Sequence, residues 1–260
     1  MNARKTLIKL VTTYAIFHLI PLHAATAPAF TPEQQAQIGQ IAADYLVNHP
    51  EILVQVSKKL QLQQQERQQT ALARRVLENE AALLKDKDTP VIGPENADVA
   101  VIEFFDYQCI YCSRLAPELE KVMKASPDVR YIFKEWPIFA SRWENSERAA
   151  LRGLDVWKQK GAAGYALYHN GIYHTGHNEG QLTAGDIENS AKSAGATEQS
   201  QGDYRSILEQ NSMLAQALEL TGTPALIVMP VKGATPTTIT VFPGLASAEQ
   251  IQAAIKKARN

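Results

Sequence analysis

The chain has 260 residues, of which 45% are hydrophobic and 20% are charged. This is the composition of a globular protein and excludes a disordered or fibrous chain. The 26 Lys and Arg residues nearly balance the 27 Asp and Glu residues, so no basic excess is present to attract nucleic acid. Only two cysteines occur, which excludes a framework of several disulfides and a four-cysteine zinc site within one chain.

Residues 1–27 have the pattern of a secretory signal peptide. Three basic residues precede a mostly apolar run, Leu10 to Leu22, and an Ala-Thr-Ala motif ends at Ala27. A membrane anchor is the alternative, but the run contains His18 and Pro21 and is shorter than the ~20 residues needed to span a bilayer. We therefore expect cleavage near Ala27 and a periplasmic mature protein, in a compartment where disulfides form and persist.

Residues 28–90 are predicted to form a helical stalk. Thr31-Pro32 followed by Gln34 is a helix start signal, and a second one precedes residues 51–88, which contain neither Gly nor Pro and predict one continuous helix. Residues 61–69 contain six glutamines, which favour a helix but cannot build a core. The alternative, a helix packed on the following domain, fits the apolar ends of this region but not its polar middle.

Residues 91–260 are predicted to form an α/β domain. A buried strand, residues 99–105, leads through a short turn to a Cys-x-x-Cys motif and a helix, and this context indicates redox chemistry. Helical patterns between the second and third strands predict an insertion at about 140–221. The further predicted elements are strands at residues 129–136, 225–229 and 238–242 and a final helix at residues 246–258.

The two cysteines are the candidate catalytic residues. Cys109 lies at a predicted helix N-terminus, where free N–H groups and the helix dipole stabilise a thiolate. Cys112 lies one turn further along the helix, where it can resolve a mixed disulfide formed by Cys109. A purely structural disulfide is the alternative, but so short a loop removes little entropy from the unfolded chain. We expect Cys109 to be the nucleophile and Cys112 the resolving thiol.

The segment from Phe104 to Cys112 resembles the active-site region of DsbA-like thiol–disulfide oxidoreductases. Thr223-Pro224 is similar to the cis-proline loop of that family, and Pro117 to the proline that kinks its active-site helix. The resemblance covers roughly residues 91–260 and implies a thioredoxin-like fold with a helical insertion. It also implies oxidation or isomerisation of disulfides in exported client proteins, without a cofactor and with a redox partner in the membrane.

The resemblance assigns roles to further residues. Glu103 matches a buried acid that helps to move the proton of the resolving cysteine, and Thr223 with Pro224 lies beside the cysteines and binds substrate backbone. Lys134 could pair with a buried Glu103 if their strands are neighbours; exposure of both at a sheet edge is the alternative.

The two residues between the cysteines add no charge. Because Ile110 and Tyr111 are neutral, the helix terminus and neighbouring groups must set the stability of the Cys109 thiolate. The redox potential does not follow from the sequence.

The predicted stalk indicates a homo-oligomer. The apolar stripes of residues 31–60 have no core of their own, so self-association is the simplest way to bury them. A stalk ahead of such a domain resembles the trimeric subgroup of ScsC-like and BcfH-like proteins, which implies a trimer.

Two other functions compete with redox catalysis. His169, His174 and His177 fall within nine residues and could join the two thiols around copper or zinc, as in a metallochaperone. Clustered histidines in a Gly- and Asn-rich stretch also fit an ordinary surface loop. A non-enzymatic holding chaperone built around the stalk is the other alternative.

Overall fold

The computed structural model describes residues 29–198, 200 and 202–260. The predicted signal peptide lies outside these residues. The chain divides between Lys58 and Lys59 into two compact units, and each is described by itself. Among the described helices, none combines the length and the apolar character that crossing a membrane requires.

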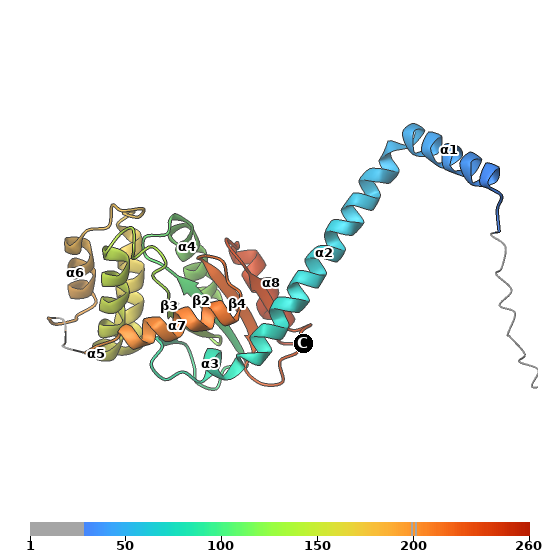
Figure 1. Ribbon diagram of the computed structural model, residues 1–260. Helices are drawn as coiled ribbons and strands as arrows, with labels where there is room; N and C mark the ends of the chain where they lie inside the picture. Colours follow the sequence, from blue (N-terminus) through green and yellow to red (C-terminus); the bar gives the residue numbers. More distant parts are fainter. Residues whose placement is uncertain (1–28, 199, 201) are drawn as a thin grey trace, which may run out of the picture. The chain divides into compact units, whose positions relative to one another are not determined.

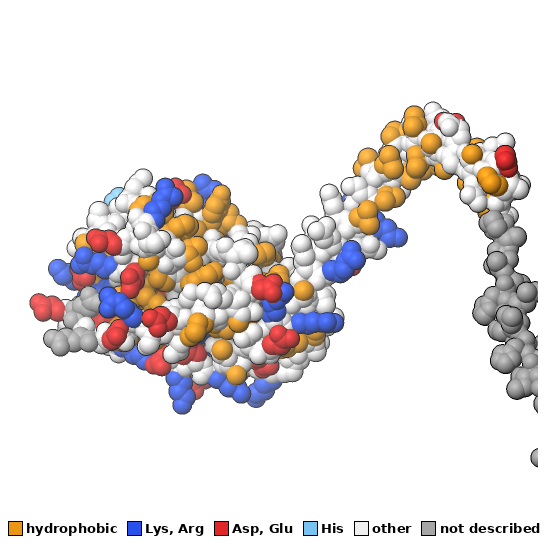
Figure 2. Space-filling model, in the orientation of Figure 1, with side chains coloured by type: hydrophobic (Ala, Val, Ile, Leu, Met, Phe, Trp, Pro, Cys, Tyr) orange, Lys and Arg blue, Asp and Glu red, His pale blue; other side chains and the backbone are white. Residues whose placement is uncertain are grey.

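The N-terminal unit consists of helix α1 (Pro32–Asn48) and the first turns of α2 (Pro50–Glu78). A capping box starts α1, in which Gln34 N donates to Thr31 Oγ1 at 3.3 Å and Thr31 N donates to Gln34 Oε1 at 2.9 Å. No residue of α1 is buried. Figure 2 shows hydrophobic side chains gathered along α1 and the start of α2; the large exposed ones on these helices up to Lys58 are Ile38, Ile41, Tyr45, Val47, Leu53, Val54 and Val56.

The helix predicted to run without interruption to Asp88 is broken near its end, which corrects that expectation. Helix α2 ends at Glu78, and a short helix α3 (Glu80–Leu84) follows. At the break, the Asn79 side chain donates to the Arg75 carbonyl at 2.9 Å, so a side-chain amide competes with the helical hydrogen bonds. Four apolar residues around the break are buried in the core beside the sheet: Ala73, Val76, Leu83 and Leu84. A helix packed on the following domain therefore describes this end of the region.

A five-stranded mixed sheet lies at the centre of the second unit, with strand order β1-β3-β2-β4-β5. Figure 1 shows its central strands β3, β2 and β4 side by side. Strands β2 and β3 are parallel, and the pairs β1–β3, β2–β4 and β4–β5 are antiparallel. Strand β1 was not predicted, because two residues carry no alternating pattern. The strands are β1 (Val91–Ile92), β2 (Val99–Phe105), β3 (Arg130–Glu135), β4 (Ala225–Pro230) and β5 (Thr240–Phe242).

Helices cover both faces of the sheet, and β2 contributes to both cores. Val99, Val101 and Phe105 pack with α4 (Ile110–Ala125), α5 (Asn145–His174), α6 (Ala184–Ser193) and α8 (Ala248–Ala258). Ala100, Ile102 and Phe104 pack with the end of α2, α3 and α7 (Arg205–Ala217). Alternate residues of a strand point to opposite faces, so this pattern divides the domain into two apolar layers. The thioredoxin-like α/β fold with helices between β3 and β4 is thus confirmed.

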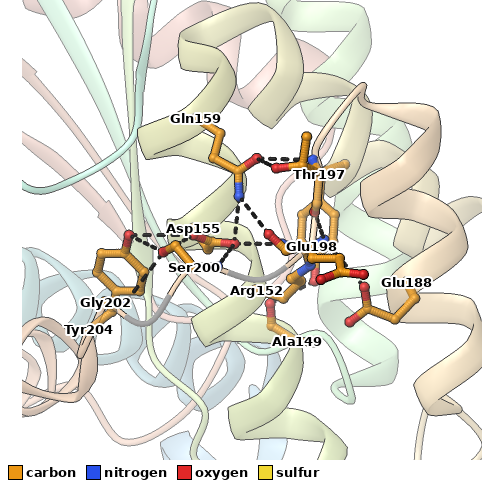
Figure 3. Close-up of polar contacts among 11 residues, drawn as sticks. Ala149, Arg152, Asp155, Gln159, Glu188, Thr197, Glu198, Ser200, Gly202 and Tyr204 are labelled. Atoms are coloured by element: carbon orange, nitrogen blue, oxygen red, sulfur yellow. Dashed lines mark hydrogen bonds and ion pairs between the residues drawn. The ribbon is translucent and has the colours of Figure 1, made fainter.

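A buried polar network on α5 holds the connection between α6 and α7 (Figure 3). Arg152 is 1% exposed, pairs with Asp155 and donates to the Thr197 carbonyl at 2.6 Å. Asp155 accepts from Ser200, and Gln159 donates to Asp155 at 2.9 Å while accepting from the Thr197 N–H at 3.0 Å. The charges of Arg152 and Asp155 compensate each other, so the network fixes the connection to α5 without an unpaired buried charge.

Gln69 on α2 covers part of the sheet edge. Its Nε2 donates to the Val241 carbonyl at 2.9 Å, and the Val241 N–H donates to its Oε1 at 3.3 Å. Strand β5 is an edge strand, whose free backbone groups need partners. The side-chain amide makes the pair of hydrogen bonds that a neighbouring strand would make.

We predict that Gln69→Ala weakens this contact. Losing both hydrogen bonds should lower the free energy of unfolding by about 1–3 kcal/mol and accelerate hydrogen exchange at the Val241 amide. Urea unfolding and hydrogen exchange measure the two effects. Gln68→Ala, one residue away and exposed, is the matched control. Equal effects of the two substitutions would contradict a specific role for Gln69.

Candidate active site

The turn between β2 and α4 places Cys109 at the N-cap of α4. Its backbone N–H donates to the Asp106 carbonyl at 3.0 Å. The buried Asp106 carboxylate accepts three hydrogen bonds, from Gln108 N at 2.8 Å, Phe139 N at 2.9 Å and Ser146 Oγ at 2.7 Å. These bonds tie the turn to the segment after β3, so Cys109 has a fixed position. Sequence reasoning missed Asp106, although an aspartate between a strand and a helix is a common turn signal.

The pKa values of the two thiols are shifted in opposite directions. The pKa of Cys109 is lowered to about 6, mainly by a hydrogen bond from Cys112. Hydrogen bonds from the Thr223 side chain and from the backbone N–H groups of Cys112 and Tyr111 lower it further, whereas burial acts in the opposite direction. Burial raises the pKa of Cys112 well above its ordinary value, and the hydrogen bond and charge of Cys109 and the charge of Glu103 add to this effect. At neutral pH, Cys109 is therefore a thiolate while Cys112 holds its proton.

The structure brings Thr223-Pro224 to this pair of thiols. The Thr223–Pro224 peptide bond is cis, and Cys109 Sγ lies 3.3 Å from the Thr223 carbonyl, to which the thiol form donates. The Thr223 hydroxyl is buried and has no other hydrogen-bond partner among the described residues, so it is available to the thiolate. Pro224 is buried directly before β4. The expected proximity of this loop to the cysteines is therefore present in the structure.

Glu103 is buried, which agrees with the expectation of a buried acid and contradicts the alternative of exposure at a sheet edge. Its side chain is 1% exposed on β2, and neither carboxyl oxygen has a hydrogen-bond partner among the described residues. Burial, followed by the negative charge of Cys109, raises the pKa of Glu103 to about 8. The group is thus a carboxylic acid at neutral pH, close enough to both thiols to interact with them electrostatically.

The expected pairing of Lys134 with Glu103 is wrong. Strands β2 and β3 are neighbours, but Lys134 lies opposite Phe104 and Glu103 lies opposite Phe133. Because adjacent residues of a strand point to opposite faces, Lys134 and Glu103 are on different sides of the sheet. Lys134 is buried, not exposed, and its Nζ bonds to Asp86 Oδ2 at 2.6 Å and Thr89 Oγ1 at 2.8 Å. It therefore anchors the segment after α3, away from the thiols.

The two residues between the cysteines differ in exposure. Ile110 is half-buried, whereas Tyr111 is 50% exposed. The guanidinium of Arg114 lies 5.5 Å from the centre of the Tyr111 ring, which is within cation–π range. Arg114 thus adds a positive charge beside the neutral pair.

The three histidines considered as metal ligands lie apart. His169 is buried within α5, His174 is exposed 4.0 Å from Glu120, and His177 bonds to Asp186 at 2.9 Å. Within the described part of the chain, no three His, Cys, Asp or Glu side chains are grouped to hold a metal ion. The other interpretation of this stretch, a surface loop, is wrong at His169, because this residue is buried in a helix. Tyr165, Tyr168 and Ile172 recur with it at helical spacing, a signal that could have revealed its burial.

We predict that iodoacetamide labels Cys109 with a midpoint near pH 6, while Cys112 stays unlabelled until much higher pH, since only the thiolate reacts. Mass spectrometry of peptides from the reduced protein measures both sites. In Cys112→Ala the midpoint should rise, because the main hydrogen bond to the thiolate is lost. Preferential labelling of Cys112 would reverse the assigned roles.

A second prediction concerns stability and pH. The folded protein holds the Glu103 proton up to about pH 8, whereas the unfolded chain releases it near the ordinary value of 4.5, so this contribution is present below pH 4.5 and lost as the pH rises to 8. Glu103→Gln, always neutral, should therefore gain about 5 kcal/mol relative to the unmodified protein between pH 4.5 and 8. Urea unfolding measures this difference. Glu120→Gln is the control, because hydrogen bonding to Lys124 lowers the Glu120 pKa; a similar gain there would refute the explanation.

Two family models match the chain. The first, described as thioredoxin, matches residues 85–256, which include the sheet and the candidate site from Glu103 to Pro224. The second, described as the copper resistance protein ScsC N-terminal domain, matches residues 34–67 within α1 and α2.

Solved structures agree with both matches. BcfH of Salmonella enterica Typhimurium is 41% identical, with a TM-score of 0.72, and the alignment covers 88% of this chain and 97% of BcfH. A linker-deletion mutant of ScsC from Proteus mirabilis is 26% identical, with a TM-score of 0.62, covering 89% of this chain and 98% of the other.

Curated relatives match over shorter segments. Disulfide bond formation protein D of Bacillus subtilis is 34% identical over 77 residues, which are 28% of this chain and 33% of that protein. The match to the Na⁺/H⁺ antiporter NhaA 1 of Salinispora arenicola, 25% identical over 126 residues, covers 48% of this chain and 19% of the antiporter. The family-model match over most of the chain and the likeness to BcfH along nearly its full length show that the chain belongs to the thioredoxin family, as a relative of BcfH and ScsC.

Proposed function

We propose that this protein is a periplasmic thiol–disulfide oxidoreductase that isomerises, and can also form, disulfides in exported proteins. The observation that carries the proposal is the pair Cys109 and Cys112, one thiol with a pKa lowered to about 6 and the other with a raised pKa, beside a cis-proline loop. A thiolate nucleophile and a protonated resolving thiol are the two groups that disulfide exchange needs. The name of the Bacillus relative supports the same chemistry.

The reaction begins at Cys109. Its thiolate attacks a sulfur of a client disulfide, forms a mixed disulfide and releases the other client sulfur as a thiolate. In isomerisation, a client thiolate then attacks elsewhere and frees Cys109. If no such attack follows, Cys112 loses its proton to the carboxylate form of Glu103. This form becomes easier to reach in the mixed disulfide, because Cys109 no longer carries the negative charge that helps to raise the Glu103 pKa. The Cys112 thiolate then attacks Cys109 Sγ, which releases the client reduced and leaves the enzyme oxidised. A membrane partner restores the reduced form.

The client is held beside the cis-proline loop. The Thr223 carbonyl lies at Cys109 Sγ, so a chain paired with this backbone would bring its own cysteine to the nucleophile. Thr223 and Pro224 are the substrate-binding residues in this proposal, and Ile110 with the exposed Tyr111 forms the adjoining surface.

The N-terminal unit gives the enzyme several active sites. The exposed apolar side chains of α1 and the first turns of α2 have no partner in one described chain, and the ScsC N-terminal model matches this region. We propose that three copies associate through these side chains. Several thiolates around one client raise the local concentration of nucleophile during repeated rounds of attack, which favours isomerisation over single oxidation.

The test compares the full mature chain with a variant that lacks residues 28–58. The deletion ends at Lys58 because Ala73, Val76, Leu83 and Leu84 belong to the core of the catalytic unit. We expect the shortened protein to be a monomer that reduces insulin at a similar rate per site but loses most of its ability to reactivate a protein with scrambled disulfides. Light scattering and the two assays measure these properties.

Two controls separate the parts of the proposal. Cys109→Ala in the full chain should abolish both activities and leave the oligomer intact. Activity that survives this substitution would refute redox catalysis and favour a holding chaperone. A shortened protein that keeps full reactivation, or stays trimeric, would refute the role of the N-terminal unit alone.

A further inference from the structure

His169 and Glu103 form a buried pair in which each faces the other. His169 lies on α5 and is 3% exposed, and its Nε2 is 4.0 Å from Glu103 Oε2. Within the described chain, Nε2 and both carboxyl oxygens have no hydrogen-bond partner. Buried polar atoms without a partner are uncommon, because each loses its bonds to water, and two such groups at one place suggest a function.

The hydrogen bond on the other side of the ring indicates the tautomer of His169. Nδ1 lies 3.1 Å from Asn170 Oδ1, an amide oxygen that only accepts, so Nδ1 carries the proton and Nε2 has a free lone pair. Burial lowers the pKa of His169 to about 4, which keeps the ring neutral at physiological pH. The lone pair therefore faces a carboxylic acid, and an approach of about 1 Å would close the gap to hydrogen-bond length.

Most of the polar groups around the pair bond to one another, although Glu135 Oε2 is also buried without a hydrogen-bond partner among the described residues. The Glu135 carboxyl on β3 accepts from the hydroxyls of Tyr107 and Tyr165, at 3.0 and 2.8 Å. On α5, Tyr173 donates to the Asp106 carbonyl at 3.3 Å and Tyr168 to the Ala149 carbonyl at 2.7 Å. The Asp106 carboxyl and the two cysteines at the start of α4 are the remaining titratable groups nearby. Among the described residues of this cluster, His169 is the one basic group.

We propose that His169 is a positioning residue for the disulfide exchange proposed above: its Nε2 accepts the hydrogen bond of protonated Glu103 and thereby sets the pH range in which Glu103 exchanges a proton with Cys112. Packing holds the ring in place, since Phe105, Phe133 and Tyr173 lie 5.0 Å from it, centre to centre. The inference rests on the proposed function and extends it by naming the group that stabilises the proton on Glu103.

The resolving step transfers one proton to Glu103 and exchanges one disulfide bond for another. The Cys112 proton passes to the Glu103 carboxylate, and the Cys112 thiolate attacks Cys109 Sγ. The bond between Cys109 and the client sulfur breaks, and the client sulfur leaves with the electron pair and takes a proton from water. Glu103 keeps its new proton, which His169 Nε2 holds by a hydrogen bond. Reduction of the enzyme by a dithiol reverses each transfer.

Removing the acceptor should make Glu103 a stronger acid. His169→Leu removes the Nε2 lone pair, so the Glu103 pKa should fall by about 0.5 to 1 unit, the effect of one hydrogen bond. In His169→Gln, the side-chain oxygen can occupy the place of Nε2 and should restore most of the original value. Carbon-13 NMR of the Glu103 carboxyl in the oxidised full-length protein measures this titration, with Glu103→Gln identifying the signal. Oxidation removes the thiol charges from the measurement.

The same shift should appear in the resolving step. Reduced protein is mixed with glutathione disulfide, and release of glutathione from Cys109 is followed by acid quench and mass spectrometry between pH 5 and 9. The midpoint of the rate profile should move to lower pH in His169→Leu, little in His169→Gln, and not at all when His169→Leu is added to Glu103→Gln.

Three results would overturn the inference. These are an unchanged Glu103 titration in His169→Leu, an equal rate shift in the Glu103→Gln background, or nitrogen-15 NMR of the unmodified protein that shows the proton on Nε2. The last measurement needs no substitution, so it decides even if a variant fails to fold. If the unmodified protein instead releases no glutathione, the proposed function fails while the NMR titrations still test the pair.

Discussion

The active site depends on the alternation of side chains along strand β2, which is buried on both faces. Odd-numbered residues from Val99 to Phe105 face the layer that contains α4 and α5, and even-numbered residues face the layer that contains α3 and α7. Because Glu103 is odd, its carboxyl lies in the layer that holds both thiols and His169. The same rule sends Lys134 to the other layer, where it binds Asp86. The alternation of side chains thus places Glu103 and the thiols on one face of the sheet and the ion pair of Lys134 with Asp86 on the other.

Within that layer, two opposing electrostatic effects make the thiols different. Cys109 lies at the end of α4, where N–H groups and hydrogen bonds favour negative charge. Cys112 lies one turn deeper, where burial and nearby negative groups oppose ionisation. A low-dielectric interior strengthens both effects. The position of each sulfur relative to the helix end therefore determines the direction of its pKa shift, and no charged residue between the two cysteines is needed.

The helical segment before the sheet serves two purposes. Its first half exposes apolar side chains, while its second half belongs to the catalytic unit through buried side chains such as Val76 and through the hydrogen bonds of Gln69 to Val241. Residues 61–69 contain six glutamines, and this composition alone predicts a polar spacer. One of them instead completes a strand edge, because a glutamine side chain carries the same amide group as the backbone.

The α/β class of the fold and the two candidate thiols followed from the sequence, because short-range patterns encode these features: a strand before Cys-x-x-Cys and a helix start at Cys109. The loop at Thr223-Pro224 followed from the resemblance to DsbA-like proteins, because no local pattern places it beside the cysteines. The sequence also indicated that Glu103 is unusual, since one acid lies within an apolar strand. It left the partner of Glu103 undecided and suggested Lys134, because the pairing register of two strands and the direction of a side chain come from contacts between distant segments. Only the tertiary structure replaced Lys134 by His169, which lies 66 positions along the chain from Glu103 and reaches it when α5 packs on the sheet.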